Sequence, residues 1–290
     1  MKFFSTLAVA TYFILPVVNA IPLLNKRQAN FRLATAEEET LQRYYMTLAG
    51  NAYCPTVIPG GKWQCPNCNR TENMEIVQTF VTPVHDTNAM VVRDDVLRRI
   101  IVTFRGSQSQ ANFDADNDWR LIAYPLSDGA RVHRGFYNSY EEIADQIIPV
   151  IEQQVEQYPD YTLAATGHSL GGATSLLCAL DLQNRGFDVE LFSQGSPRVG
   201  DREFAQYIVD TGLKYTRLTN KRDLFVDIPP TLLGYRHAGE EYWIRADEKI
   251  QVCANGLETD YCYNSGTGRK TVEDHMNYFE LTSNGECPDV

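Results

Sequence analysis

Short runs rich in β-branched and aromatic residues alternate along the chain with longer segments whose apolar residues recur at helical spacing. The short runs predict buried strands at Glu75–Val81, Ile100–Phe104, Tyr161–Thr166, Val189–Ser193, Tyr215–Thr219 and Glu241–Ile244. The longer segments predict helices at Thr35–Ala52, Tyr140–Gln157, Leu170–Arg185 and Asp201–Thr211. Strands that alternate with helices favour an α/β fold, in which helices cover both faces of a mostly parallel sheet.

Residues 28–290 contain no internal repeat, low-complexity tract or Pro/Ser-rich linker, so we expect a single domain there. In a parallel sheet covered on both faces, ligands bind beyond the carboxyl ends of the strands. Residues that carry chemistry are therefore expected in the loops that directly follow strands.

The first residues are typical of a secretory signal peptide. Lys2 precedes a largely apolar run that ends near Val18, and the small residues there predict cleavage after Ala20, so that residues 1–20 are removed. A membrane anchor is the less favoured interpretation, because polar residues and a proline interrupt a run already shorter than the roughly 20 residues of a spanning helix. The dibasic Lys26-Arg27 predicts that residues 21–27 are a short propeptide. We expect a secreted, extracellular mature chain, monomeric and without a transmembrane segment.

Composition narrows the class of partner. With 43% hydrophobic and 22% charged residues, the chain of 290 residues has an ordinary globular composition. Its formal net charge of −11 repels phosphate backbones and anionic headgroups, so a role in nucleic-acid binding is disfavoured. The expected partner is a neutral molecule.

Seven cysteines in an exported chain predict three disulfides and one free thiol. Spacing alone does not fix the pairing, but Cys65 and Cys68 are close in sequence, as are Cys253 and Cys262, which leaves Cys54 and Cys287 to join the two ends of the domain. Cys178 lies in an apolar run and is predicted to be a buried thiol. A zinc or redox site at Cys65-Pro66-Asn67-Cys68 is disfavoured, because no second close pair of ligands accompanies it. Asn69 heads the sequon Asn69-Arg70-Thr71 and predicts a glycosylated surface loop.

The segment Gly167-His168-Ser169-Leu170-Gly171 matches the pattern G-x-S-x-G. A predicted strand precedes it and a predicted helix follows it, which is the setting of a nucleophile elbow. Such an elbow strains the serine backbone and leaves no room for side chains two residues away, hence the two glycines. Ser169 is the predicted nucleophile. The amide of Leu170, at a helix N-terminus, is a predicted oxyanion donor.

A serine nucleophile needs a histidine base and an acid that orients it, and in this architecture they follow the serine in the order acid, histidine. Of the five histidines, His275 best satisfies this order. Asp223, just beyond a predicted strand, is favoured as the acid over Asp227. Asp274 is disfavoured because it is the immediate neighbour of the base.

Five motifs in a fixed order resemble those of one family; they are Val102–Ser107, Val132–Phe136, Gly167–Ala173, Gln194–Gly200 and His237–Ile244. On these motifs nearly all of the mature chain resembles the secreted filamentous-fungal triacylglycerol lipases of the Rhizomucor type. The resemblance implies an α/β-hydrolase fold with Ser169, Asp223 and His275 as the triad. It also implies Ser107 as the second oxyanion donor. The disulfides that it implies are Cys54–Cys287, Cys65–Cys68 and Cys253–Cys262.

The segment after Ser107 departs from that family. Its lipases carry there a short amphipathic lid helix, and the corresponding lid residues here are Gln110, Ala111, Asn112, Phe113, Asp114, Ala115 and Asp116. So small an apolar face buries little area at an oil surface, at about 25 cal/mol per Å². The lid is similar in this respect to the polar lids of fungal feruloyl esterases. Asp116 matches the family position that holds the hydroxyl of the oxyanion serine when the lid is open.

The hypothesis from the sequence is acyl transfer from a neutral ester, most simply an acylglycerol, with no metal and no cofactor. A feruloyl or other soluble ester is the alternative substrate, and a catalytically idle scaffold that binds other molecules is the alternative class. The family positions suggest an acyl-binding wall of Tyr53, Phe113, Trp119, Phe225, Ile228 and Met276.

Overall fold

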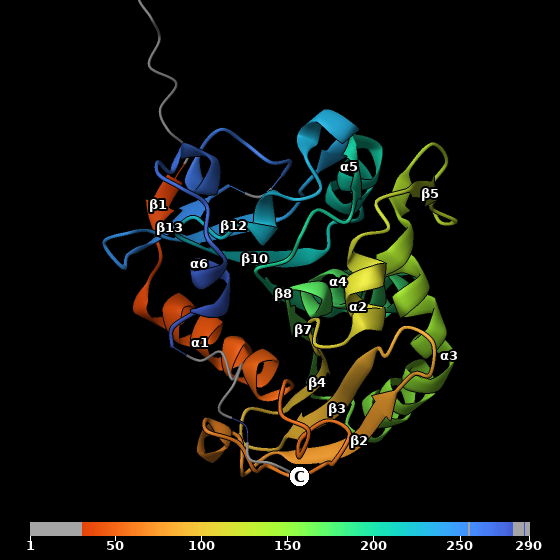
Figure 1. The fold of residues 1–290 in the computed structure, drawn as a ribbon. Coiled ribbons are helices and arrows are strands. Elements are labelled where there is room, and N and C mark those ends of the chain that lie inside the picture. Colours follow the sequence, from red (N-terminus) through yellow and green to blue (C-terminus); the bar gives the residue numbers. More distant parts are fainter. Residues whose placement is uncertain (1–30, 255, 281–286, 288–290) are drawn as a thin grey trace, which may run out of the picture.

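A nine-stranded sheet runs through the part of the chain that the computed structural model describes, residues 31–254, 256–280 and 287 (Figure 1). Its order is β1-β13-β12-β10-β8-β7-β4-β3-β2. The strands are β1 (Phe31–Leu33), β2 (Glu75–Val81), β3 (Asn88–Asp94), β4 (Arg99–Phe104), β7 (Thr162–His168), β8 (Val189–Gln194), β10 (Lys214–Asn220), β12 (Glu240–Ile244) and β13 (Ile250–Cys253). The central strands β4, β7, β8, β10 and β12 are parallel, and the strands at both edges are antiparallel. The predicted signal peptide (1–20) and propeptide (21–27) lie outside the described residues.

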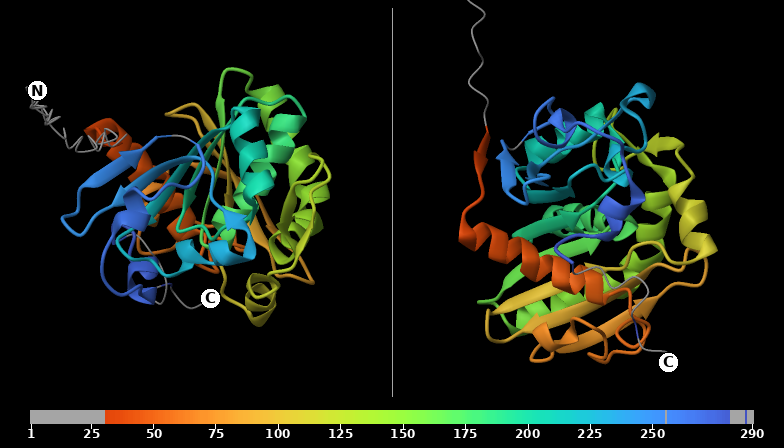
Figure 2. Two further views of the ribbon diagram at one scale, coloured as in Figure 1. Left: turned by 90° about the horizontal axis from the view of Figure 1, so that it is seen from above. Right: turned by 60° about the vertical axis from the view of Figure 1, so that its left-hand side comes forward.

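A small antiparallel sheet, six α-helices and four short 3₁₀ helices complete the described elements. The small sheet has the order β11-β9-β6-β5, formed by Tyr235–Arg236, Gly200–Asp201, Arg131–His133 and Leu121–Ala123. The helices are α1 (Ala36–Asn51), α2 (Gln110–Asp116), α3 (Arg134–Gln157), α4 (Leu170–Asn184), α5 (Arg202–Thr211) and α6 (Val272–Met276). Helix α1 lies on one face of the large sheet, and α3, α4 and α5 lie on the other (Figure 2).

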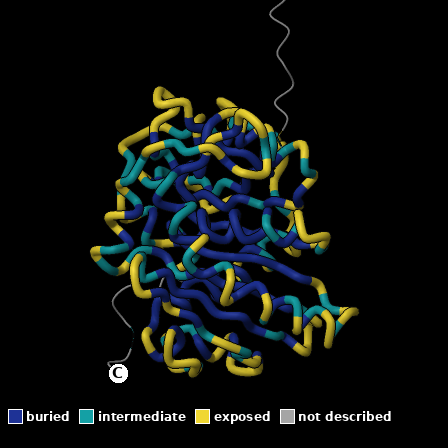
Figure 3. Tube along the Cα trace, turned by 90° about the vertical axis from the view of Figure 1, so that its right-hand side faces the viewer, coloured by how far each residue is buried: buried dark blue, intermediate teal, exposed yellow. Residues whose placement is uncertain are grey.

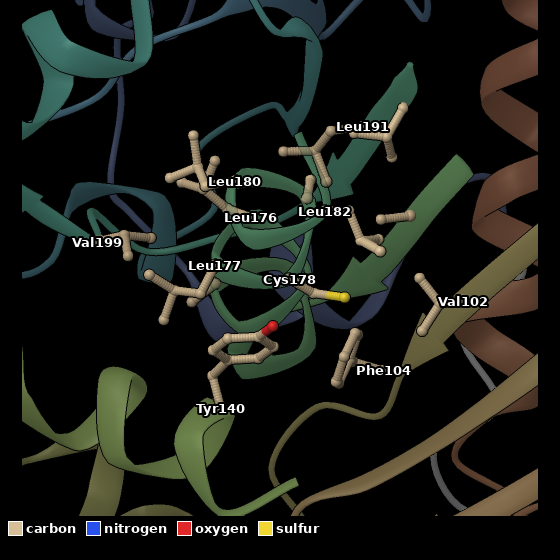
Figure 4. Packing of buried hydrophobic residues seen from close by; sticks show 14 of the residues in the cluster. Val102, Phe104, Tyr140, Leu176, Leu177, Cys178, Leu180, Leu182, Leu191 and Val199 are labelled. Carbon is tan, nitrogen blue, oxygen red and sulfur yellow. The ribbon is translucent and has the colours of Figure 1, made fainter. Parts of the chain in front are cut away.

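The central strands of the large sheet are buried on both faces, and their successive side chains point to opposite sides and enter two different cores. Along β4, Ile100 and Val102 join the core beneath α3 and α4, whereas Ile101 joins the core beneath α1. Helix α4 is apolar around nearly its whole circumference and packs Leu176, Leu177 and other side chains into the first core (Figure 4). The central strands are accordingly buried, and the exposed residues gather in the surrounding loops (Figure 3).

The sequence predicted the central strands and the helices α1, α4 and α5 to within a few residues. Strand β3 and the first turns of helix α3 are among the features that it missed. Strand β3 is buried along nearly its whole length, so it lacks the alternation that marks a half-exposed strand. Helix α3 begins at Arg134 rather than Tyr140, because His133 caps it: the Phe136 N–H donates to His133 Nδ1 at 3.3 Å. Histidine is not among the residues that usually mark a helix start.

Three disulfides join Cys54 to Cys287, Cys65 to Cys68 and Cys253 to Cys262, as the sequence and the resemblance suggested. Cys178 is a buried free thiol on α4 (Figure 4). Asn69 is exposed, in a short 3₁₀ helix (Cys68–Arg70) that begins at the Cys65–Cys68 bridge. Among the described helices, none has both the length and the hydropathy that crossing a bilayer demands.

Candidate active site

The predicted functional residues gather at the carboxyl edge of the parallel strands. Ser107 follows β4, Ser169 follows β7 and Asp223 follows β10, while His275 lies on α6. Main-chain pairing joins the last two segments: Leu224 N–H donates to the carbonyl of Thr271 at 3.1 Å. Residues far apart in sequence are therefore brought together by the sheet.

Ser169 occupies the sharp turn between β7 and α4. Its φ of 59° and ψ of −128° are a strained conformation for a non-glycine residue. A Cβ on Gly167 would lie 2.2 Å from the carbonyl oxygen of Gly171, and a Cβ on Gly171 would lie 2.2 Å from that of Phe104. Both flanking glycines are thus required by the close approach of backbone. Leu170 is the first residue of α4, where amide groups have no acceptor within the helix.

Asp223 and His275 form a hydrogen-bonded pair. His275 Nδ1 lies 2.8 Å from Asp223 Oδ2 and 3.0 Å from Oδ1. The Tyr278 hydroxyl donates to the same Oδ2 at 2.7 Å, and the Phe225 N–H donates to Oδ1 at 2.8 Å. Because Asp223 is fully buried, these donors replace the water that would solvate its carboxylate. The acid can hold the imidazole in one tautomer and one orientation.

The His275 ring lies between two other rings. Its centroid is 4.3 Å from that of Phe225 and 4.4 Å from that of His168. His168 directly precedes Ser169, and its Nε2 lies 3.0 Å from the carbonyl oxygen of His275. The base candidate therefore lies against the residue next to the nucleophile candidate.

The remaining histidines and one competing acid have other partners. His85 pairs with Glu142 at 2.9 Å, His133 caps α3, and His237 Nε2 lies 2.7 Å from the Val226 carbonyl oxygen. Asp227 is paired with Arg198 and Lys270. This leaves Asp223 and His275 as the pair beside the elbow.

The other disfavoured acid, Asp274, accepts a hydrogen bond from the backbone N–H of Arg222 at 3.2 Å. Asn220, at the end of β10, donates from Nδ2 to the carbonyl oxygens of Asp274 and Asn277, each at 2.8 Å. The strand end is thereby tied to the segment that carries His275.

Helix α2, the predicted lid, is attached to the site through Ser107 and Asp116. The Ser107 hydroxyl donates to Asp116 Oδ2 at 2.6 Å. Burial raises the pKa of Asp116 to about 6, although the hydrogen bond from Ser107 acts in the opposite direction. The hydroxyl of Ser107 is thus held at the edge of the sheet, where a developing oxyanion could meet it.

The other end of the lid is held by Asn112, which is buried. Its Nδ2 donates to the carbonyl oxygens of His85 and Asp86, and its Oδ1 accepts from Arg105 and from the amides of Gln108 and Ser109. Phe113 is 46% exposed, so the one large apolar side chain of the lid faces outward.

The predicted acyl-binding wall divides into two groups. Phe225 packs on His275, and Trp119, Ile228 and Met276 are partly buried. Tyr53 is buried, and its hydroxyl lies 2.8 Å from His168 Nδ1. This hydroxyl is therefore committed to the elbow.

Three further side chains beside the site are not marked as functional by any motif in the sequence. Tyr278 and Asn220 support the acid and the base, and His168 supports the backbone of His275. Tyr278 follows His275 by three residues, and His168 is part of the elbow motif. Neither position carries a signal in one sequence that separates such a role from ordinary core packing.

Comparison with known proteins places the chain in a family. The family model "Lipase (class 3)" matches residues 101–233. The lipase of Rhizomucor miehei is 46% identical over 263 residues, which cover 88% of this chain and 72% of the relative. Secreted mono- and diacylglycerol lipase 1 of Fusarium solani is 31% identical over 273 residues, 88% of this chain and 81% of the relative.

Solved structures agree with this grouping. The native Rhizomucor miehei lipase–propeptide complex matches with a TM-score of 0.84 at 45% identity, covering 88% of this chain and 85% of that chain. A structure described as a serine protease triad forming the catalytic centre of a triacylglycerol lipase matches with a TM-score of 0.83 at 45% identity, covering 87% and 98% of the two chains. The chain therefore belongs to the class 3 lipase family of carboxylic ester hydrolases and has the α/β-hydrolase fold.

Proposed function

We propose that this protein is a secreted serine lipase in which Ser169, Asp223 and His275 form the catalytic triad. The observation that carries the proposal is the buried Asp223–His275 pair, with its 2.8 Å contact, beside the strained Ser169. Backbone strain of this kind costs free energy and clusters at functional sites, and a buried carboxylate is retained only where hydrogen bonds compensate it. The described residues contain no cluster of side chains able to hold a metal ion, and the proposed chemistry needs none.

The reaction is acyl transfer in two halves. His275 takes the proton of Ser169 as its oxygen attacks the ester carbonyl, and Asp223 stabilises the imidazolium that forms. The oxyanion accepts hydrogen bonds from the Leu170 amide and from the Ser107 hydroxyl, whose single proton turns from Asp116 to the oxyanion. His275 then protonates the leaving alcohol. Water repeats the sequence on the acyl-enzyme, which releases the carboxylic acid and restores Ser169.

We take a neutral acylglycerol as the substrate and the extracellular space as the place of action. Support comes from the relatives that are named as lipases, one of them as secreted, and from the predicted signal peptide. A net charge of −11 also suits a neutral ester better than an anionic one. Phe225, Ile228, Met276 and Trp119 are the proposed acyl-contacting side chains, and Asn69 is the proposed glycosylation site.

One observation favours a second candidate, hydrolysis of a soluble aromatic ester such as a feruloyl ester. The lid helix α2 buries only Asn112 and Ala115 and exposes Phe113 and Asp114. A lid with so little apolar area gains little at an oil surface. An enzyme with such a lid would act on soluble esters without needing an interface.

A substrate panel separates the two candidates. The rate is measured against tributyrin concentration across its solubility limit, and against methyl ferulate, for the wild type and for Ser169→Ala. A lipase increases its rate when tributyrin exceeds solubility and hydrolyses methyl ferulate poorly. A smooth curve with good ferulate turnover would instead identify the esterase. If a fluorophosphonate probe fails to label Ser169, the triad itself is wrong and a binding scaffold becomes the better interpretation.

A further inference from the structure

His168 lies at the centre of a chain of buried hydrogen bonds that starts outside the triad. Tyr53 lies two residues beyond the end of α1. Its hydroxyl lies 2.8 Å from His168 Nδ1. On the other side of the ring, His168 Nε2 lies 3.0 Å from the carbonyl oxygen of His275. Both side chains are buried, so water does not compete for these groups.

The partners determine the tautomer of His168. A carbonyl oxygen can only accept, so Nε2 carries the proton and donates it to the His275 carbonyl. Nδ1 then has a free lone pair and accepts from the Tyr53 hydroxyl. In the alternative tautomer the His275 carbonyl would face an unprotonated nitrogen, which is repulsive, and Tyr53 would lose its acceptor.

The carbonyl that His168 contacts belongs to a helix end. Helix α6 has only five residues, and the carbonyl groups of a last helical turn have no partner within the helix. His168 supplies a donor to one of them, at the residue that carries the base. It therefore fixes the backbone of His275, whereas Asp223 fixes the side chain.

Burial suits His168 to this task. It lowers the pKa of His168 well below the ordinary histidine value, and the nearby His275 lowers it further. A neutral ring 4.4 Å from His275 does not oppose the positive charge that the base acquires during the reaction. A protonated His168 would repel that charge.

Tyr53 also touches the segment that carries the oxyanion serine. A Cβ on Gly106 would lie 1.8 Å from the Tyr53 hydroxyl and 2.7 Å from the carbonyl oxygen of His168. The backbone just before Ser107 therefore packs directly on the Tyr53–His168 pair. One buried pair contacts the nucleophile turn, the oxyanion loop and the backbone of the base.

We propose that His168 and Tyr53 are positioning residues, which hold the His275 backbone and the Gly106–Ser107 segment in register with Ser169. The proposal rests on the proposed function, because it concerns how the triad is held. It reassigns the hydroxyl of Tyr53 from an acyl-binding wall to this pair. Neither residue is expected to touch the substrate carbonyl or to exchange a proton with it.

Two amide variants separate the two contacts of His168. The His168→Gln side chain places an N–H donor near the position of Nε2, so it can still reach the His275 carbonyl. The His168→Asn side chain reaches only as far as Nδ1, so it can meet Tyr53 but not His275. We expect His168→Asn to lower kcat by about 10²-fold at nearly constant KM, and His168→Gln to recover most of that loss.

Tyr53→Phe removes one hydroxyl without disturbing the ring, and Tyr215→Phe is its matched control. Tyr215 is also buried, and its hydroxyl lies 3.1 Å from Ser193 Oγ, so this bond joins strands β10 and β8 and involves neither a triad residue nor the oxyanion loop. Both variants are expected to lower thermal stability by similar amounts. Only Tyr53→Phe is expected to lower kcat, by about fivefold. Equal kcat values for the two variants would overturn the role of Tyr53.

A spectroscopic readout tests the arrangement independently of activity. ¹⁵N NMR of the labelled protein should show the His168 ring neutral, with Nε2 protonated and Nδ1 bare, from pH 5 to pH 8. A ring protonated at Nδ1, or one that titrates in this range, would overturn the proposal, as would wild-type kcat in His168→Asn. If the wild type hydrolyses no ester, the proposed function fails, while the NMR result still decides whether the pair is arranged as described.

Discussion

The Asp223–His275 pair and the lid helix α2 lie at the same edge of the sheet, but they are held very differently. Asp223 is fully buried and receives hydrogen bonds from His275, Tyr278 and the Phe225 amide. Helix α2 has only seven residues, and the two that are buried include a single apolar one, Ala115. Burial and several hydrogen bonds fix the pair, whereas the helix is held mainly by the polar contacts of Asn112 and Asp116 and buries little apolar surface.

The difference separates chemistry from access. Proton transfer requires a base and an acid at fixed distances, so movement at Asp223 or His275 would be costly to the rate. A lid must move to admit substrate, and an element with little buried apolar area separates from the protein at low cost. We infer that the family's chemistry resides in the fixed edge, and that the substrate preference of this chain resides in the lid.

The largest expected effect comes from replacing Asp223, the buried acid of the Asp223–His275 pair. Asp223→Asn keeps the shape of the side chain but presents an amide to His275 Nδ1, which can stabilise the wrong tautomer. We expect kcat for a soluble ester to fall by about 10⁴-fold, with little change in KM. Steady-state kinetics with p-nitrophenyl butyrate measures it, and circular dichroism checks that the variant is folded.

Asp227→Asn is the control for this variant, because Asp227 was the competing acid and is paired with Arg198 and Lys270. It should lose stability through the broken ion pairs but retain kcat to within a few-fold. A collapse of kcat in Asp227→Asn, with activity retained in Asp223→Asn, would exchange the two assignments.

The contrast between these acids also shows what the sequence could predict. The elbow could be predicted because its glycines follow from local backbone geometry. The acid could be predicted because the loops after parallel strands meet at one edge of the sheet. The roles of Tyr278 and His168 could not be predicted, because these side chains contact groups 55 and 107 residues away in sequence. The short strands β1 and β13 were missed for a similar reason, since they exist mainly through pairing with distant strands.

The second prediction concerns Ser107, which follows β4 and is hydrogen-bonded to Asp116 of the lid helix. Ser107→Ala removes one of the two proposed oxyanion donors, and the loss of one such donor lowers kcat by about 10²- to 10³-fold. Ser107→Thr keeps the hydroxyl and should retain most of the activity. Equal activity of the alanine variant and the wild type, under conditions where Ser169 is labelled by fluorophosphonate, would remove Ser107 from the mechanism.

The third prediction concerns Asp116 of the lid helix and the pH dependence of the free energy of unfolding. Burial raises the pKa of Asp116 from 3.8 to about 6, so between these values the folded chain binds a proton that the unfolded chain has lost. Stability therefore falls as pH rises through this window, by about 3 kcal/mol in total for a shift of roughly two pH units. Asp116→Asn cannot ionise and should be more stable than the wild type at pH 8, by up to that amount.

Chemical denaturation at pH 4, 6 and 8 measures this effect. The stabilisation by Asp116→Asn should shrink towards zero at pH 4, where the wild-type carboxyl is largely protonated in the folded state. Asp114→Asn, an exposed carboxylate on the same helix, serves as the control and should change stability little at any of these pH values. A difference between Asp116→Asn and the wild type that does not vary with pH would contradict the assignment.

The smallest expected effect concerns the lid surface. Asp114 is exposed beside Phe113 and accepts a hydrogen bond from Gln110 Nε2 at 2.8 Å, so its carboxylate lies on the outer face of α2. Asp114→Leu would join Phe113 in a larger apolar face, because it removes a charge and adds an aliphatic side chain. Since even partial burial of a leucine is worth about 1 kcal/mol or more, we expect the rate on emulsified tributyrin to rise roughly three- to tenfold. The rate on dissolved p-nitrophenyl acetate should stay nearly constant.

Asp114→Asn distinguishes charge from apolar area, because it removes the carboxylate without adding an aliphatic surface. If it increases the emulsion rate as much as Asp114→Leu does, electrostatic repulsion at the lid limits the enzyme on lipid. If only the leucine variant gains, the missing apolar area is the limit. If neither variant changes the ratio of the two rates, the lid does not set the substrate preference, and the contrast between a fixed catalytic edge and a selective lid is wrong.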